Sequence, residues 1–216
     1  MSVPILSALE ARVLGVLVEK QHTVPDTYPM TLSALAGGCN QKTSRSPVMA
    51  VTEAEVQATL DALKVDAWVV ETSGGRVMRY AHNVERVLDV PAQSAALLAV
   101  LMLRGPQTAA ELRVNCDRLH RFADVSAVEG FLSELAQRPA GALVVELARA
   151  PGTRETRWVQ RLSAAPTDTQ REATKPSSDI EMLRSDVADL RRDLDRLSDT
   201  VSALCAKLAA SNPPST

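Results

Sequence analysis

The sequence predicts a mainly α-helical protein with small β-hairpins, organised as two similar halves followed by a C-terminal helix. Apolar residues recur at helical spacing behind helix-capping residues, and two β-rich segments flank turn residues. The order of elements also repeats. "TLSAL" at residues 31–35 corresponds to "TAAEL" at 108–112, and "WVV" at 68–70 corresponds to "LVV" at 143–145. These matches indicate a duplicated module.

The first half is expected to form three helices, a short extended segment and a hairpin. In a capping box, a Ser or Thr accepts from the backbone N–H three residues on, and a Glu there returns the bond. Such boxes and the turn residues place a helix after Ser7/Glu10, an extended segment at Tyr28, a helix after Thr31, a helix after Thr52/Glu55 and a hairpin around Gly74-Gly75.

The second half shows the same order. The expected elements are a helix between Pro91 and Gly105, a helix after the capping box Thr108/Glu111, a helix over residues 126–138 and a hairpin with Pro151-Gly152 at its tip. The order helix, strand, helix, helix, hairpin is that of a winged-helix domain. We therefore expect winged-helix (helix-turn-helix) domains at residues 1–84 and 85–163.

The C-terminal part carries a linker and a heptad repeat. Residues 164–178 are rich in Ala, Pro, Thr and Ser, which is typical of a linker. Residues 179–209 are expected to form a coiled-coil helix that makes a homodimer. The alternative is an amphipathic helix that folds back on its own domains. The predicted dimerisation positions are Ile180, Leu183, Val187, Leu190, Leu194, Leu197, Val201, Leu204 and Leu208.

Residues 39–49, "CNQKTSRSPVM", place two cations among small polar side chains. Pro47 prevents a helix from running through this stretch, and a new helix starts at Thr52. The stretch is therefore expected to be a long ordered turn between the second and third helices.

This stretch also carries a resemblance. "LEARVLGVLVEKQHTVPDTYPMTLSALAGGCNQKTSRSPVM" followed by "ELRVNCDRLHRFADV" resembles the YceH-like family of uncharacterised bacterial proteins. The similarity covers roughly residues 5–162. It implies tandem winged-helix domains and no particular activity.

Winged-helix domains often bind double-stranded DNA through the third helix, which then needs basic or amide side chains facing the grooves. Here the outward positions of both third helices are largely acidic, namely Glu53, Glu55, Gln57, Thr59 and Asp61 in the first half and Glu129, Ser133, Glu134 and Gln137 in the second. This composition disfavours groove reading by those helices.

The candidate phosphate or DNA contacts lie elsewhere, and they are Asn40, Gln41, Lys42, Arg45, Arg76, Arg79, Arg118 and Arg121. In the alternative interpretation these are solvated charges, and Asn40 and Gln41 tie down the long turn. We expect a non-enzymatic, DNA-associated or transcription-regulatory protein. The alternative is a protein–protein interaction adaptor that does not bind DNA.

Composition excludes several other classes. The net charge of −2 provides no global attraction for nucleic acid or membranes, and the longest apolar run, residues 95–103, is too short to cross a bilayer. Three dispersed cysteines fit reduced thiols, so a cytoplasmic location is expected. Cys116 and His120 could supply two metal ligands, but two do not make a site. No catalytic motif, cofactor or metal is predicted.

Overall fold

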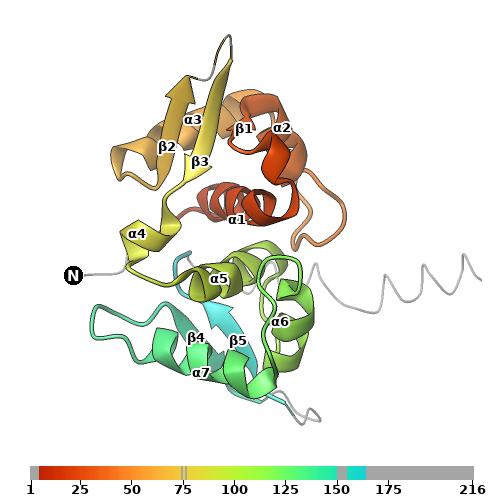
Figure 1. Ribbon diagram of the computed structural model, residues 1–216, viewed down its shortest axis with the longest axis vertical. Coiled ribbons are helices and arrows are strands. Elements are labelled where there is room, and N and C mark those ends of the chain that lie inside the picture. Colours follow the sequence, from red (N-terminus) through yellow and green to blue (C-terminus); the bar gives the residue numbers. More distant parts are fainter. Residues whose placement is uncertain (1–4, 74, 76, 150–154, 164–216) are drawn as a thin grey trace, which may run out of the picture. The chain divides into compact units, whose positions relative to one another are not determined.

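Helices and short antiparallel strands alternate in the same order in both halves (Figure 1). The computed structural model describes residues 5–163 except 74, 76 and 150–154. The elements of the first half are α1 (Ala8–Thr23), a 3₁₀ turn (Pro25–Thr27), β1 (Met30–Thr31), α2 (Leu32–Cys39), α3 (Glu53–Val65), β2 (Val69–Ser73) and β3 (Met78–His82). Those that follow are α4 (Val84–Leu88), α5 (Ala92–Arg104), α6 (Ala109–Cys116), α7 (Val125–Ala136), β4 (Val144–Leu147) and β5 (Arg157–Gln160).

The predicted capping boxes start α1, α3 and α6. In α1, Ser7 N donates to Glu10 Oε2 at 2.6 Å, and Glu10 N donates to Ser7 Oγ at 3.2 Å. Thr52 with Glu55 and Thr108 with Glu111 make the same reciprocal pair. These local hydrogen bonds satisfy N–H groups that a helix start leaves without intrahelical partners.

The second helix of the second half ends earlier than its sequence suggests. Its pattern extends to Leu119, but α6 stops at Cys116, whose carbonyl accepts from Leu119 N at 2.7 Å and from His120 N at 2.8 Å. The chain then bends so that Phe122, 4% exposed, reaches the core. Burial of this ring accounts for the shorter helix, and α7 restarts from Asp124, whose side chain accepts from Ala127 N.

The two sheets are small and antiparallel. In the first half the strand order is β1-β3-β2. Tyr80 of the central strand β3 lies opposite Met30 of β1 on one side and opposite Glu71 of β2 on the other. In the second half β4 pairs with β5, and a single bridge between Gln107 and Trp158 occupies the position that β1 holds in the first half. The fold class, mainly helical with small antiparallel sheets, is therefore as predicted.

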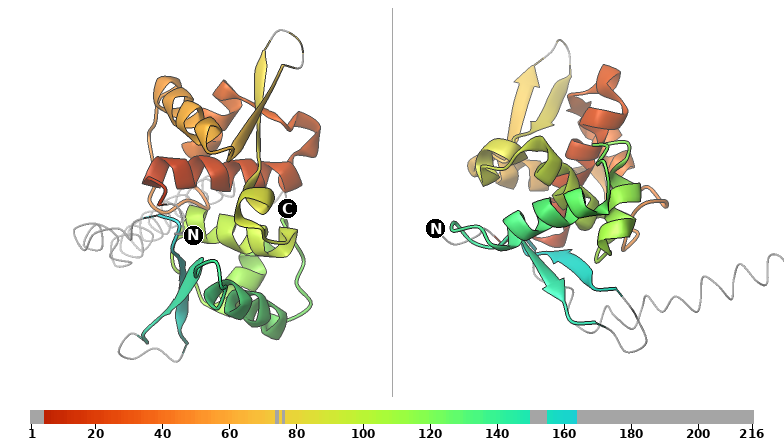
Figure 2. Two further views of the ribbon diagram at one scale, coloured as in Figure 1. Left: turned by 90° about the vertical axis from the view of Figure 1, so that its left-hand side faces the viewer. Right: turned by 60° about the horizontal axis from the view of Figure 1, so that its bottom comes forward.

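Helices α1 and α5 lie against each other and join the halves (Figures 1 and 2). Half of the residues of α1 and most of those of α5 are buried, and one core of Leu, Val, Ala and Met side chains extends through both halves. Leu6 N also donates to Leu162 O at 2.6 Å, which ties the start of the first half to the end of the second. The described residues thus belong to one compact unit.

The predicted boundary between residues 84 and 85 falls at the start of α4, and the division into two domains stays a prediction. The predicted linker, coiled-coil helix and dimerisation positions lie outside the described residues. Within residues 5–163, as far as they are described, no helix has the length and apolarity needed to cross a membrane.

Candidate functional site

The loop between α2 and α3, residues 40–52, is held from inside by Arg45. This side chain is buried, and its guanidinium donates to both oxygens of Glu19, at 3.1 Å to Oε1 and 2.6 Å to Oε2. It also donates to Gln41 Oε1 at 2.7 Å and to Gly38 O at 3.2 Å. Burial alone would raise the pKa of Glu19, but the hydrogen bonds and charge of Arg45 outweigh it and lower that pKa.

A second buried arginine, Arg12, links the start of this loop to its middle. It donates to Cys39 O at 3.2 Å and to Pro47 O at 2.6 Å. Desolvation and the neighbouring Arg45 lower the pKa of Arg12. Asn40 adds a two-way bond, accepting from Val51 N and donating to Val51 O, both at 2.8 Å. The loop is therefore fixed by internal polar contacts.

The described cysteines are buried thiols. Burial raises the pKa of Cys39 to about 11, in spite of the two nearby arginines, and that of Cys116 to about 12. Both side chains are therefore neutral at physiological pH. In the described part of the chain, no group of three or more His, Cys, Asp or Glu side chains is arranged to hold a metal ion.

A polar cleft of about 200 Å³ lies where the loop meets the second half. Its cationic side chains are Lys20 from α1, Arg104 from the end of α5 and Arg118 from the segment after α6. Arg104 donates to Ser44 Oγ at 2.7 Å, and Ser46 N donates to Leu103 O at 2.7 Å. These bonds hold the loop against α5, so the walls of the cleft come from both halves.

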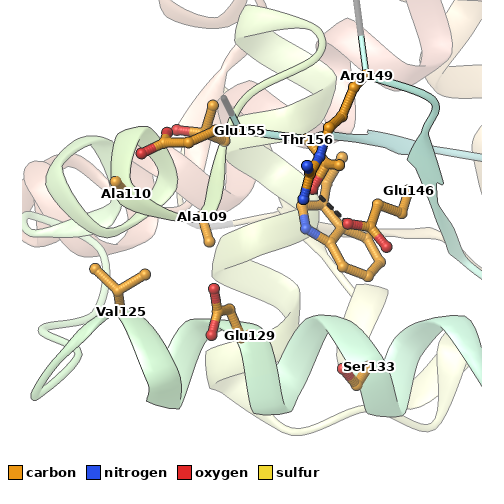
Figure 3. A pocket seen from close by; sticks show the side chains of 11 residues that line it. Ala109, Ala110, Val125, Glu129, Ser133, Glu146, Arg149, Glu155 and Thr156 are labelled. Atoms are coloured by element: carbon orange, nitrogen blue, oxygen red, sulfur yellow. Dashed lines mark hydrogen bonds between the residues drawn. The ribbon is translucent and has the colours of Figure 1, made fainter. Parts of the chain in front are cut away.

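A larger groove, of about 440 Å³, lies in the second half between α7 and the hairpin β4–β5 (Figure 3). Glu129 points into it from α7, and Glu146, Arg149 and Glu155 come from the hairpin. Glu146 accepts from the Thr156 hydroxyl. Three carboxylates and one guanidinium give this groove an excess of negative charge, beside the half-buried ring of Trp158.

Comparison with known proteins places the chain in a family. A family described as "Protein of unknown function, DUF480" matches residues 6–153. A UPF0502 protein of Dechloromonas aromatica is 56% identical over 200 residues, covering 91% of this chain and 94% of the relative. UPF0502 proteins of Burkholderia thailandensis and Cupriavidus taiwanensis are 54% and 52% identical, covering 94% and 95% of this chain and 89% and 88% of the relatives.

The chain belongs to the DUF480/UPF0502 family. This confirms the YceH-like resemblance seen in the sequence. The resemblance was recognised up to about residue 162, but an alignment of 200 residues extends beyond residue 163. The relatives of this UPF0502 chain therefore share at least part of its C-terminal segment.

Among the eight candidate contact residues of this UPF0502 chain, those that the structure describes do not form one surface. Arg45 is buried, Asn40 is bonded to the backbone, and Arg79 donates to Pro29 O at 2.7 Å and Thr27 O at 3.3 Å. Arg76 lies outside the described residues. Lys42 and Arg121 are exposed, and Arg121 forms an ion pair with Asp117 at 3.9 Å. Gln41 and Arg118 both line the polar cleft of about 200 Å³.

Sequence reasoning missed Lys20, Arg104 and Asn115, which line the cleft with Gln41 and Arg118. Each lies on or at the end of a helix where a polar residue is ordinary. The packing of α1 on α5 brings them together, and no spacing in the sequence encodes that contact.

Proposed function

We propose that this protein is a non-enzymatic adaptor that holds a basic segment of a partner protein in the acidic groove of its second half. The proposal includes two tandem winged-helix domains. Its support is the repeated order of helix, strand, helix, helix and hairpin, the strand order β1-β3-β2, and the matching bridge at Gln107. On this assignment α3 and α7 are the third helices, which enter the major groove in DNA-binding relatives of the fold.

The acidity of the groove beside α7 carries the proposal. Glu129, Glu146 and Glu155 face a space where a DNA-binding winged-helix domain would need cations. DNA phosphates would be repelled there, whereas a Lys or Arg side chain would gain charge-assisted hydrogen bonds. The half-buried ring of Trp158 offers a face for the apolar stem or the cation of such a side chain.

The third helix of the first half offers little to DNA either. Its cation, Lys64, lies 2.8 Å from Asp61 and 2.7 Å from Glu71, while Glu53 and Glu55 are exposed. Arg157 of the second hairpin pairs with Glu111 at 3.0 Å. Internal pairing thus uses cations that phosphate binding would require.

A DNA-associated or transcription-regulatory role is the second candidate, and one observation favours it. Lys20, Arg104 and Arg118 converge on the cleft from both halves. Three cations could hold nucleic-acid phosphates with weak, salt-sensitive affinity.

The test compares proteins retained from the cytosol of the native source by the immobilised full-length chain and by two variants. Glu129→Gln/Glu146→Gln removes charge from the groove, and Glu134→Gln removes an exposed α7 carboxylate that does not line it. We expect a partner retained by the wild type and the control but released by the double variant. The affinity of that partner for the protein, measured by calorimetry, should fall about tenfold or more in the double variant. It should also weaken as the salt concentration rises.

A labelled DNA duplex titrated in parallel separates the two candidates. The adaptor proposal fails if no retained protein depends on the groove carboxylates. It also fails if the partner's contact segment is acidic. Duplex binding that weakens with salt and with Arg118→Gln, a cation of the cleft, would instead favour the DNA-associated role.

A further inference from the structure

We propose that the cleft between the two halves binds a phosphate group, carried by a small molecule. This inference goes beyond the adaptor function and uses a different surface. The cleft holds about 200 Å³ and is lined by Lys20, Arg104 and Arg118 together with hydroxyl and amide side chains such as Thr43 and Asn115. A recess rich in cations and hydrogen-bond donors matches the chemistry of an oxyanion.

The charge balance of the cleft favours an anion. Glu19 is the one carboxylate among its lining residues, and both its oxygens accept from the buried guanidinium of Arg45. Lys20 also approaches Glu19, at 3.3 Å. Three cations line the cleft, and the buried Arg45 next to Glu19 adds a fourth, against the single carboxylate of Glu19. The excess positive charge lies in a partly enclosed space, where screening by water is weaker than on an open surface.

Arg104 and Gln41 are held in place before any ligand arrives, and Arg118 is available to pair with one. Arg104 is fixed by one hydrogen bond to Ser44 Oγ, which leaves other N–H groups of its planar fork for a ligand. Gln41 Oε1 accepts from Arg45 and, at 3.4 Å, from Lys20, so the amide nitrogen of Gln41 remains a donor. Arg118 has no hydrogen bond or ion pair with any residue that the structure describes. A phosphate would connect these groups across the two halves.

The size of the cleft favours a small phosphate compound over a duplex. Specific duplex binding usually neutralises six to ten phosphates, roughly, along an extended surface. Here the cations gather in one recess with space for a single phosphate or pyrophosphate group. A free phosphate compound and a nucleic-acid backbone share this chemistry, so the experiment includes both.

The experiment titrates the full-length protein with inorganic phosphate and with pyrophosphate, by calorimetry at constant ionic strength. Arg118→Gln and Arg104→Gln are compared with Arg86→Gln, an exposed arginine of α4 that does not line the cleft. Each cleft variant should bind pyrophosphate roughly ten- to a hundredfold more weakly, since each loses charge-assisted hydrogen bonds. Arg86→Gln should match the wild type, and Arg118→Lys should recover part of the affinity.

Arg118 is exposed, so its replacement leaves the fold intact even if Arg104→Gln does not. The proposal is overturned if neither anion binds, or if Arg118→Gln and Arg86→Gln bind equally well. A labelled duplex is titrated with the same variants. Duplex binding that needs Arg118 and is displaced by pyrophosphate would confirm the phosphate site and overturn the small-molecule source. The phosphate experiment does not depend on the adaptor function, because the acidic groove and the cleft share no lining residue. The phosphate site can therefore be confirmed even if the adaptor proposal fails.

Discussion

At the scale of single residues, Arg45 is a buried charged side chain whose hydrogen bonds hold a surface loop together. Its guanidinium satisfies a carboxylate, an amide and a main-chain carbonyl while excluded from water. Burying such a group is costly unless each donor finds a partner. The planar fork of arginine meets that demand better than lysine would, because it can reach both Glu19 oxygens at once.

Removing Arg45 should therefore destabilise the protein far more than removal of an exposed cation. For Arg45→Met we expect about 3–5 kcal/mol less free energy of unfolding in urea, because the mostly buried Glu19 loses its bidentate partner and keeps only Lys20, at 3.3 Å. Arg45→Met/Glu19→Leu should recover much of this loss.

The pH dependence provides the control for this prediction. The folded state lowers the pKa of Glu19, so the stabilisation from its ionised form is present at neutral pH and is lost as pH falls through the acid range. Glu19→Gln should therefore show a weaker loss of stability with acid than the wild type. A cost below about 1 kcal/mol for Arg45→Met would mean that the pair behaves as a solvent-exposed one.

At the scale of elements, the contact between α1 and α5 depends on a glycine. A Cβ at Gly15 would lie 2.9 Å from Leu103 Cγ and 3.3 Å from Ala99 O. Without a side chain there, the two helices approach closely enough for their apolar faces to form one core. This contact also fixes the position of Arg104 relative to the loop, and therefore the cleft.

Gly15→Ala should lower the free energy of unfolding by about 1–3 kcal/mol, because overpacking exceeds the gain in helix propensity. The matched control is Gly130→Ala on α7, where nothing lies within 4 Å of the new Cβ. That variant should gain about 0.5–1 kcal/mol. Thermal and urea unfolding of both variants measure the difference. Equal stabilisation by both would show that α1 and α5 are not closely packed at Gly15.

At the scale of the whole molecule, the two halves together form the cleft in which we propose that a phosphate group binds. The cleft takes its walls from both, whereas the acidic groove lies within the second half. A ligand in the cleft and a partner in the groove would thus engage different surfaces of the same chain.

We also propose that the C-terminal heptads make the chain a homodimer, on the strength of their sequence pattern alone. Sedimentation velocity of the wild type should give a dimer, and Leu190→Asp/Leu197→Asp, at two d positions, should give a monomer. Arg192→Asp, at an outward f position, is the control and should stay dimeric. A monomeric wild type would favour a helix that folds back on its own chain.

Local signals predicted most of the fold because their causes are local. Ser7, Thr52 and Thr108 start helices by bonding to groups three residues away, and Gly74-Gly75 lies between two short β-rich runs that pair directly. The candidate site was predicted only in part. Gln41 and Arg118 were named, but Arg45 was expected outside, because a cation among polar residues is usually solvated.

The sequence by itself determined the family, the helix starts, the duplicated order of elements and the long turn after α2, since short-range hydrogen bonds and apolar periodicity encode them. Only the tertiary structure decided which cations are available to a ligand. Glu19 and Arg45 lie far apart in the chain, and the folding of the loop between α2 and α3 onto α1 pairs them. Packing of α1 on α5 brings Lys20 and Arg118 to the same cleft. A charge's role depends on its neighbours in space, and those neighbours come from long-range contacts that no local pattern records.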